Sequence, residues 1–214
     1  MQEITTEIQS PVNPFVSDVE IKNGDNQGVK VIKWTQDEYY KMAELGFFHG
    51  KRVELIEGEI IEMSPMRSPH ATAVSLVYEV LREVFDNNHF IRNQQPLSFS
   101  KITEPEPDLA VIKGKIRDFS DSHPKTAELL IEVSDATIYY DRGKKSNLYA
   151  KNKIQDYWII NLKDNRLEVY RRPIKDENAY YGFSYGEKLI FTEQDEVSPL
   201  AASRAKIKVA DLLP

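Results

Sequence analysis

The feature that most constrains this chain is an acidic residue inside a short apolar run. Residues 129 to 135 read LLIEVSD, which places Glu132 between Ile131 and Val133. A short run of branched apolar residues is typical of a strand that is buried on both faces in the interior of a sheet. An ionised carboxylate is costly in such a strand unless a cation or hydrogen bonds compensate it. We therefore expect a partner for Glu132.

A second acid stands at the start of another strand-like run. Asp108 opens the sequence DLAVI, and the Pro-Glu-Pro stretch at 105–107 keeps the chain extended before it. Asp108 and Glu132 are far apart in the sequence, so their carboxylates come together only if the two strands pair. Carboxylate oxygens, a backbone carbonyl and retained waters are the ligands that Mg²⁺ takes. The alternative is that Asp108 caps a turn and that Glu132 pairs with an Arg or Lys in the core.

The segment after the acidic strand is basic and helical in pattern. A helix is predicted over about 138–151, in which Asp141, Lys145 and Tyr149 recur every four residues on one face. This face lies close to the apolar side of the helix, so we expect it to point inward. A Lys there can stabilise charge on a phosphoryl oxygen or orient an attacking water. The alternatives are an ordinary surface ion pair with Asp141 and a role for the neighbouring Lys144.

An acid also lies in a predicted hairpin. The sequence RVELI, the pair Glu57-Gly58 and the sequence EIIEM indicate two strands joined by a two-residue turn. With this turn, Glu54 would oppose Ile61 on the same face of the hairpin. An acid opposite an apolar residue suggests that the acid is partly buried and has a functional role. An equal alternative is a carboxylate at the rim near Arg52.

The remaining elements complete a mixed α/β fold. Thr35 and Glu38 match a capping box and predict a first helix that extends to Phe48, and Ser68-Pro69 predicts the cap of a second helix over about 70–86. Two apolar strands joined by a helix should be parallel. We therefore expect a mixed central sheet flanked by helices, with an N-terminal helix and hairpin. Strands are predicted at 96–99, 108–112, 127–134, 156–161 and 166–172, and within 180–191 and 205–209.

Length and composition indicate one domain. The chain has 214 residues, no cysteine and 41% apolar content, so disulfides and thiolate metal sites are excluded. We expect a flexible acidic tail over 1–30 and a single domain over 31–214. The N-terminus lacks the pattern of a secretory signal, and no apolar run is long enough to span a bilayer. These features favour a soluble cytoplasmic protein.

The charge distribution is uneven. The net charge of −6 argues against a nucleic-acid partner, since Lys and Arg drive phosphate binding. However, residues 1–25 hold five acids against one base, and residues 141–153 hold five bases against one acid. The basic stretch could face a polyanion, and the alternative is a solvated helix face.

Histidines give little indication of a metal site. His70, at the start of the second predicted helix, could assist a base or contact a phosphate, and the alternative is a structural hydrogen bond. The other histidines lack metal-ligand spacing, and the sequence contains no glycine-rich phosphate loop or serine nucleophile elbow. Zinc and nucleotide-binding functions are thus disfavoured.

Six segments follow one another along the chain in a characteristic order, and their combination is far more specific than any one of them. The segments are RVELIEGEI, SPxxxxH, PEPDLAVI, LLIEVSD, YDRGKKxxLYA and QDYWIINL. With these segments the chain resembles a large bacterial family of proposed restriction endonucleases in the PD-(D/E)XK nuclease superfamily. The resemblance covers residues 34–172 and implies a restriction-endonuclease-like fold that hydrolyses phosphodiester bonds with Mg²⁺.

The resemblance also implies roles for single residues. The motif Asp matches Asp108, the motif Glu matches Glu132, and an early acid of the pattern best matches Glu54. The superfamily places a Lys two positions after the Glu, where this chain has Ser134. Relatives of this style carry the Lys on the following helix, which would make it Lys145.

Two functional hypotheses follow. In the first, the protein is a Mg²⁺-dependent nuclease of DNA, with Mn²⁺ as a substitute, in which Asp108, Glu132 and the Val133 carbonyl hold the ion. Lys145 then steadies developing charge, and Glu54 orients water or a second ion. In the second, the protein is a catalytically silent relative that binds nucleic acid or protein, because the Lys two positions after the motif Glu is missing. A glycoside hydrolase would explain neither the Lys nor the basic helix.

Many nucleases of this fold act as dimers so that both strands are cut, and the resemblance therefore implies a homodimer. An aromatic cluster near the C-terminus could supply the dimer surface, although its members are equally good core residues. The cluster comprises Tyr180, Tyr181, Phe183 and Tyr185.

Overall fold

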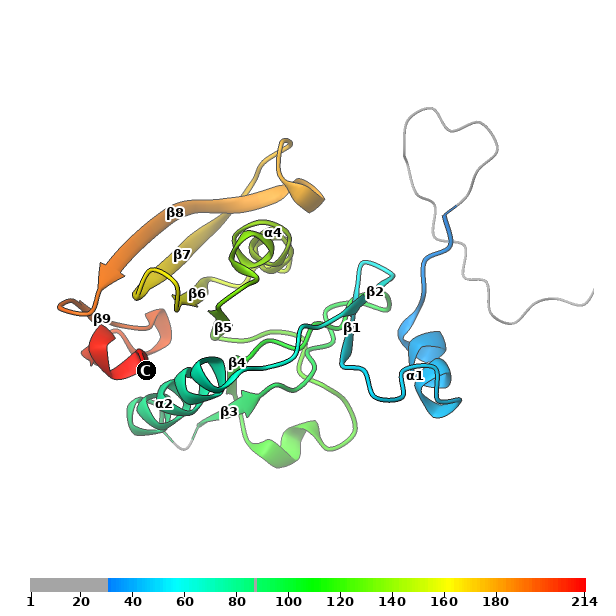
Figure 1. The fold of residues 1–214 in the computed structure, drawn as a ribbon, viewed down its shortest axis with the longest axis horizontal. Helices are drawn as coiled ribbons and strands as arrows, with labels where there is room; N and C mark the ends of the chain where they lie inside the picture. The colour runs from blue at the N-terminus through cyan, green and yellow to red at the C-terminus, as the bar shows by residue number, and fades with distance from the viewer. Residues whose placement is uncertain (1–30, 87) are drawn as a thin grey trace, which may run out of the picture.

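A six-stranded mixed sheet organises the chain in the computed structural model, which describes residues 31–86 and 88–214 (Figure 1). The predicted tail over 1–30 lies outside the described residues. The strand order is β3-β4-β5-β6-β7-β8, in which β5 and β6 are parallel and every other neighbouring pair is antiparallel. The strands are β3 His89–Asn93, β4 Leu109–Lys113, β5 Leu129–Ser134, β6 Asp156–Asn161, β7 Arg166–Lys175 and β8 Phe183–Thr192.

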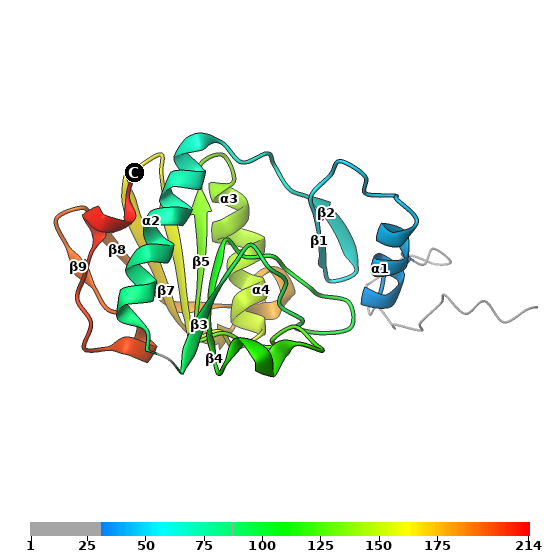
Figure 2. The same cartoon turned by 90° about the horizontal axis from the view of Figure 1, so that it is seen from below.

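Helices cover both faces of this sheet. Figure 2 shows α2 (Ser68–Val84) on one side of β5 and the helical segment 138–151 on the other. This segment consists of α3 (Ile138–Tyr140), a π-helical turn (Asp141–Lys145) and α4 (Ser146–Lys151). It also connects β5 to β6, so the predicted parallel strand-helix-strand unit is confirmed.

The alternation of side chains along β5 separates two cores. Leu129 and Ile131 pack with Val77 of α2, in a cluster that the C-terminal residues also join. Leu130 packs on the other face, with Leu148 of α4. Because successive side chains of a strand point to opposite faces, Glu132 shares the face of Leu130 and points toward the helical segment.

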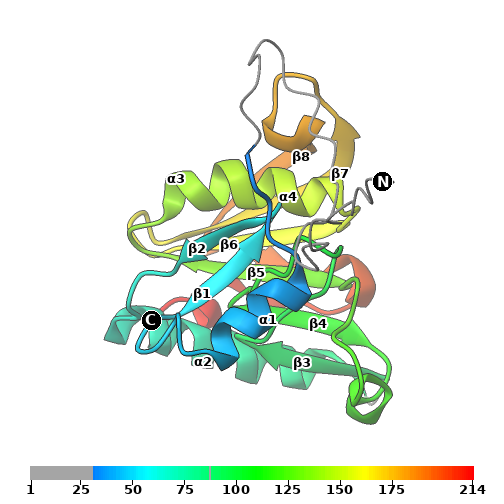
Figure 3. The same cartoon turned by 90° about the vertical axis from the view of Figure 1, so that its right-hand side faces the viewer.

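A smaller third core joins the N-terminal elements. It packs residues of α1 (Gln36–Glu44) against the hairpin of β1 (Val53–Ile56) and β2 (Glu59–Glu62), which Figure 3 shows next to each other. The hairpin turn has positive φ at Glu57 (50°) and Gly58 (77°), as a primed turn requires. The hairpin attaches to the main sheet region through two backbone hydrogen bonds between Leu55 and Glu104.

Short elements close the face that α2 covers. Buried apolar residues from the C-terminal segment complete this core, among them Val197 and Ile207. The elements are β9 (Glu196–Val197), paired with β10 (Ile207–Lys208), and the 3₁₀ turns Leu200–Ala202 and Val209–Leu212. Two further 3₁₀ turns are Ile116–Phe119 and Tyr180–Gly182.

Three predictions of local structure were wrong. Residues 96–99 form no strand, because the backbone N–H groups of 97–99 bond to separate loop carbonyls, and Leu97 alone among the four is buried. The first helix ends at Glu44, before the left-handed Gly46 (φ 82°), and does not reach residue 48. Ser68 is the first residue of α2, so it does not cap the helix.

The capping box of Thr35 and Glu38 is confirmed, as is the pairing of Glu54 with Ile61 across the hairpin. Within the aromatic cluster of the C-terminal region, Tyr185 stacks on the core residue Tyr157, while Tyr180 is 57% exposed. The homodimer stays a prediction. Among the described residues, no helix has both the length and the hydropathy needed to cross a membrane.

Candidate active site

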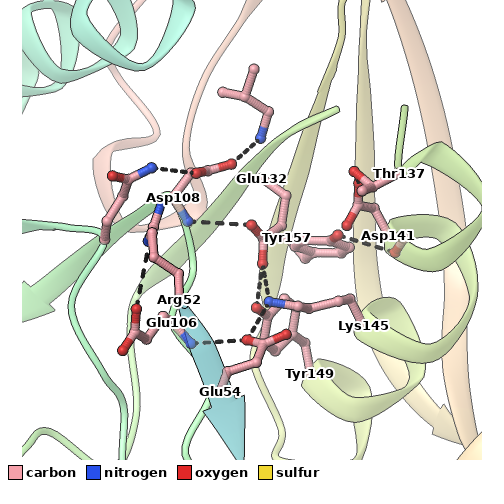
Figure 4. Close-up of polar contacts among 12 residues, drawn as sticks. Arg52, Glu54, Glu106, Asp108, Glu132, Thr137, Asp141, Lys145, Tyr149 and Tyr157 are labelled. Carbon is pink, nitrogen blue, oxygen red and sulfur yellow. Dashed lines mark hydrogen bonds and ion pairs between the residues drawn. The ribbon is translucent and has the colours of Figure 1, made fainter. Parts of the chain in front are cut away.

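Asp108 and Glu132 lie side by side where β4 and β5 pair. Leu109 is the partner of Ile131 in this antiparallel ladder, so the residue before Leu109 comes opposite the residue after Ile131. The Asp108 N–H donates to Glu132 Oε2 (3.2 Å), and the Val133 N–H donates to Asp108 Oδ2 (2.8 Å; Figure 4). Both carboxylates are buried, as a site between a sheet and a helix requires. Strand pairing therefore brings together two acids that are distant in the sequence.

Lys145 joins these acids from the helical segment. Its Nζ lies 3.1 Å from Glu132 Oε1 and 2.8 Å from Glu54 Oε2, and the side chain is buried (Figure 4). The alternative of an ordinary surface ion pair is wrong, because the Asp141 carboxylate accepts a hydrogen bond from Thr137 Oγ1 instead. The rival Lys144 points elsewhere, with its Nζ 5.8 Å from the ring centroid of Tyr180.

A wide helical turn carries Lys145. Asp141–Lys145 is π-helical, and the N–H of Ser146 reaches back to the Asp141 carbonyl. The Tyr157 hydroxyl donates to the same carbonyl (3.1 Å). The Asp141 carbonyl therefore accepts two hydrogen bonds, one from the Ser146 N–H and one from Tyr157. Isolated π-helical turns often occur at functional sites. The helical pattern of the sequence did not predict this turn. Gly143, which lies within it, was the residue whose type could have indicated an irregular helix.

Glu54 is buried and acts as a partner of Lys145. Its Oε2 accepts the Lys145 ammonium and the backbone N–H of Glu106 (3.1 Å). The alternative of a rim carboxylate near Arg52 is wrong, since Arg52 lies 3.7 Å from Glu106 Oε2 and Glu54 is only 2% exposed. The hairpin thus contributes one carboxylate to the same polar cluster.

Two side chains hold the other oxygen of Asp108. His70 Nε2 and Gln94 Nε2 each lie 3.0 Å from Asp108 Oδ1. His70 therefore makes the structural hydrogen bond that was the alternative prediction, and the acceptor is Asp108, an acid of the site. Gln94 was not identified from the sequence, because a single Gln after an unrecognised edge strand carries no pattern.

Burial and charge shift the pKa values of the acids in opposite directions. Burial raises the pKa of Glu132 to about 8, with Asp108 adding to the shift and Lys145 opposing it. Burial alone would raise the pKa of Asp108 too, but hydrogen bonds from His70, Gln94 and the Val133 N–H hold it below its usual value. One acid is thus stabilised as an anion, and the other would gain from a further cation.

The surrounding acids favour the protonated forms of two basic groups of the site. Burial opposes the charged form of Lys145, but Glu132 and Glu54 hold its pKa well above the usual value. Burial likewise opposes protonation of His70, yet its hydrogen bond to Asp108 and the charge of that acid raise its pKa overall. The Lys145 ammonium therefore balances part of the negative charge of the site.

A cavity of about 630 Å³ opens beside the acids. Glu54, Asp108, Glu132 and Lys145 are among the residues that line it, so the four predicted residues face one shared space. The rest of the wall mixes apolar and charged side chains. It includes Met63, Met66, Tyr140, Arg52, Arg67, Asp135 and Asp141.

The donor set fits a hard divalent ion such as Mg²⁺. Asp108 Oδ2 and Glu132 Oε2 each accept one hydrogen bond from the described residues, which leaves acceptor capacity on both atoms. Mg²⁺ is commonly held by one or two carboxylates and retained waters. Within residues 31–86 and 88–214, no group of three or more His, Asp or Glu forms a metal site by itself. The Val133 carbonyl as a ligand stays a prediction.

The basic stretch over 141–153 does not form one free surface patch, so the possibility that it faces a polyanion gains no support. Arg142 pairs with the buried Glu168, and Lys151 lies 2.6 Å from Glu57. Lys145 is buried in the site. Three of the five bases are therefore engaged within the protein.

An Asp and a Glu on adjacent strands of a mixed sheet, with a Lys beside them, form the arrangement that the resemblance to PD-(D/E)XK nucleases implies. The chain belongs to the Uma2 family, described as "Putative restriction endonuclease", whose model matches residues 36–207. Its fold is similar to the crystal structure of "a putative nuclease belonging to DUF820" from Anabaena variabilis, with a TM-score of 0.62. The sequences are 20% identical, over 83% of this chain and 96% of that one. Among curated proteins, none matches the chain.

Proposed function

We propose that the protein is a Mg²⁺-dependent endonuclease that hydrolyses phosphodiester bonds of DNA. Family membership and the nuclease-like fold support nuclease activity. The observation that carries the proposal is that Glu132 contacts both its strand neighbour Asp108 and the buried Lys145, and that all three residues line one cavity. Structural ion pairs alone would not require an open cavity beside them.

The side chains divide the chemistry among themselves. When bound, Mg²⁺ would supply Lewis acidity and activation of the attacking water. Asp108 and Glu132 would hold the ion, and Lys145 would stabilise negative charge that develops on a phosphoryl oxygen. Glu54 holds Lys145 in place through the 2.8 Å contact and would orient water. Tyr149 donates its hydroxyl to Glu132 Oε1 and fixes the orientation of that carboxylate.

DNA as the substrate rests on the family description and on two arginines of the cavity wall. Arg52 and Arg67 line the same cavity as the acids, where they could contact phosphates on either side of the scissile bond. The net charge of −6 provides no broad attraction to DNA. We therefore expect weak binding with a shallow salt dependence, because only a few cations near the site would contact phosphates.

The test is divalent-dependent cleavage of plasmid and oligonucleotide DNA. Asp108→Ala and Glu132→Gln should each abolish cleavage in Mg²⁺ and in Mn²⁺, while circular dichroism shows a folded protein. Asp121→Ala, which alters an exposed acid outside the cavity, is the matched control and should cleave normally. Undiminished cleavage by the Asp108 variant would refute the assignment.

A catalytically silent binding module is the second candidate, because Ser134 occupies the position of the superfamily Lys. Lys145 reaches Glu132 from the following helical segment instead, and this contact favours the active enzyme. Calorimetric titration with Mn²⁺ separates the two candidates, since a silent site should show no saturable binding that depends on Glu132. The homodimer and the cytoplasmic location remain predictions.

A further inference from the structure

Two elements that are separate in the sequence converge on a single oxygen atom. His70 belongs to the first turn of α2, and Gln94 directly follows β3. Each places a nitrogen 3.0 Å from Oδ1 of Asp108. Because an ionised carboxylate only accepts hydrogen bonds, both nitrogens must be donors, which fixes a proton on His70 Nε2 and the orientation of the Gln94 amide.

The backbone of Gln94 is also committed to Asp108. Its N–H donates to the Asp108 carbonyl (3.0 Å), which continues the pairing of β3 with β4 beyond the last residue of β3. The backbone has φ 51°, in the left-handed region that residues other than Gly rarely adopt. Unfavourable backbone conformations of this kind persist where the surrounding contacts demand them, and they cluster at functional sites.

These contacts decide which oxygen of Asp108 is available. Oδ1 accepts from His70 and Gln94, so both of its lone pairs are used. Oδ2 accepts one bond, from the Val133 N–H, within the described residues. The remaining capacity of the carboxylate therefore lies on Oδ2, the oxygen bonded to the strand that carries Glu132.

We propose that His70 and Gln94 are positioning residues that fix the Asp108 carboxylate so that Oδ2 is presented to a divalent cation. The inference rests on the proposed function, in which Asp108 holds the ion. Hydrogen bonds to the non-coordinating atoms of a metal ligand set its orientation, and removing such a partner typically lowers metal affinity about 10- to 100-fold. His70 therefore acts through Asp108 and not as a contact to phosphate.

The experiment measures the Kd of Mn²⁺ by calorimetry for the full chain and its variants. His70→Ala and Gln94→Ala remove one donor each, and His70→Gln keeps a donor at a similar reach. His89→Ala is the matched control, because His89 Nδ1 lies 3.0 Å from Asp86 Oδ1 in the same kind of pair outside the cavity. Thermal unfolding followed by circular dichroism reports the fold of each variant.

We expect both Ala variants to bind Mn²⁺ about 10- to 100-fold more weakly. The His70→Gln variant should recover most of the affinity, and the His89 control should match the wild type. Cleavage by the Ala variants should need more Mg²⁺ for half-maximal rate and approach the wild-type rate at saturating Mg²⁺. A merely structural role would lower thermal stability without this shift in metal requirement.

Unchanged Mn²⁺ affinity in both folded Ala variants, with binding lost in Asp108→Ala, would overturn the inference and leave the proposed function intact. Absence of Mn²⁺ binding by the wild type would overturn both. If His70→Ala does not fold, Gln94→Ala decides, because wild-type affinity in that variant contradicts the proposal and weakened affinity supports it.

Discussion

Lys145 places its Nζ 2.8 Å from Oε2 of Glu54, across 91 positions of sequence. Both side chains are buried, and they come from different elements, the helical segment 138–151 and the hairpin strand β1. This contact ties the hairpin to the face of the sheet that bears the paired acids. The site thus depends on the N-terminal elements as well as on the central sheet.

Replacing Lys145 with Met should destabilise the protein by about 3–5 kcal/mol, since it leaves buried acids without their cation. The added substitution Glu54→Gln should recover part of this loss. Urea unfolding provides the measurement, with the neighbouring Lys144→Met as a control that should change stability by about 0.5 kcal/mol or less. Equal effects of the two Lys substitutions would contradict the assignment of Lys145 to the buried cluster.

Divalent ions should stabilise the folded protein against heat. Binding to the folded state alone adds about 2.7 kcal/mol at an ion concentration 100 times the Kd. The wild type and the Asp121→Ala control should therefore show a higher Tm in Mn²⁺, which a chelator reverses. Asp108→Ala should show no such rise, and a full rise in this variant would mean that the ion binds elsewhere.

Glu168 should make stability depend on acid pH. Burial alone would raise its pKa, but hydrogen bonds from Arg142, Asn161, Lys188 and Tyr170 hold the pKa far below the usual value of 4.5. A lowered pKa in the folded state means that the carboxylate stabilises the protein above about pH 4.5 and that this contribution is lost as the pH falls.

Glu168→Gln should accordingly lower the free energy of unfolding at pH 7 by about 1–3 kcal/mol, the range for hydrogen bonds to a charged group. Its stability should then fall less steeply than that of the wild type between pH 4.5 and pH 3. Urea unfolding across this range is the measurement, and Glu187→Gln on the exposed side of β8 is the control. Parallel pH profiles for wild type and Glu168→Gln would be inconsistent with the lowered pKa.

Gly58 in the hairpin turn and Gly50, which precedes β1, form a matched pair of glycines. Gly58 and Gly50 have similar φ angles of 77° and 75°, so an Ala suffers the same left-handed strain at both. A Cβ at Gly58 would lie 2.6 Å from Lys33 Cβ, whereas nothing lies within 4 Å at Gly50. Gly58→Ala should therefore cost about 1–3 kcal/mol more than Gly50→Ala in urea unfolding. Equal losses would show that the turn can move without cost.

Local patterns predicted the parts of the fold that local interactions determine. The apolar run around Glu132 indicated an interior strand, and the pair Glu57-Gly58 fixed the hairpin register that puts Glu54 opposite Ile61. The pairing of the strands that carry Asp108 and Glu132 was a condition of the metal hypothesis, and the structure satisfies it. A buried acid in an apolar strand therefore gave a reliable indication of a polar cluster.

Other parts depend on contacts that no local pattern encodes. β3 is a short edge strand without clear alternation, and it was missed together with Gln94, whose importance comes from Asp108 on the next strand. The apolar residues at 96–99 suggested a strand, although only Leu97 among them is buried and the segment forms no ladder. The pairing of Arg142 with Glu168 likewise became visible only once the π-helical turn and β7 were placed.

The π-helical turn has a consequence for how such a site can arise or be lost. A regular helix advances about 100° per residue, so removing one residue from Asp141–Lys145 would rotate one flank by that angle relative to the other. Either the Lys145 amine would move away from Glu54 and Glu132, or Ile138 would lose its packing in the core on this face of the sheet. Insertion or deletion of one residue in this turn would therefore move the Lys145 ammonium into or out of reach of Glu54 and Glu132 without changing any strand.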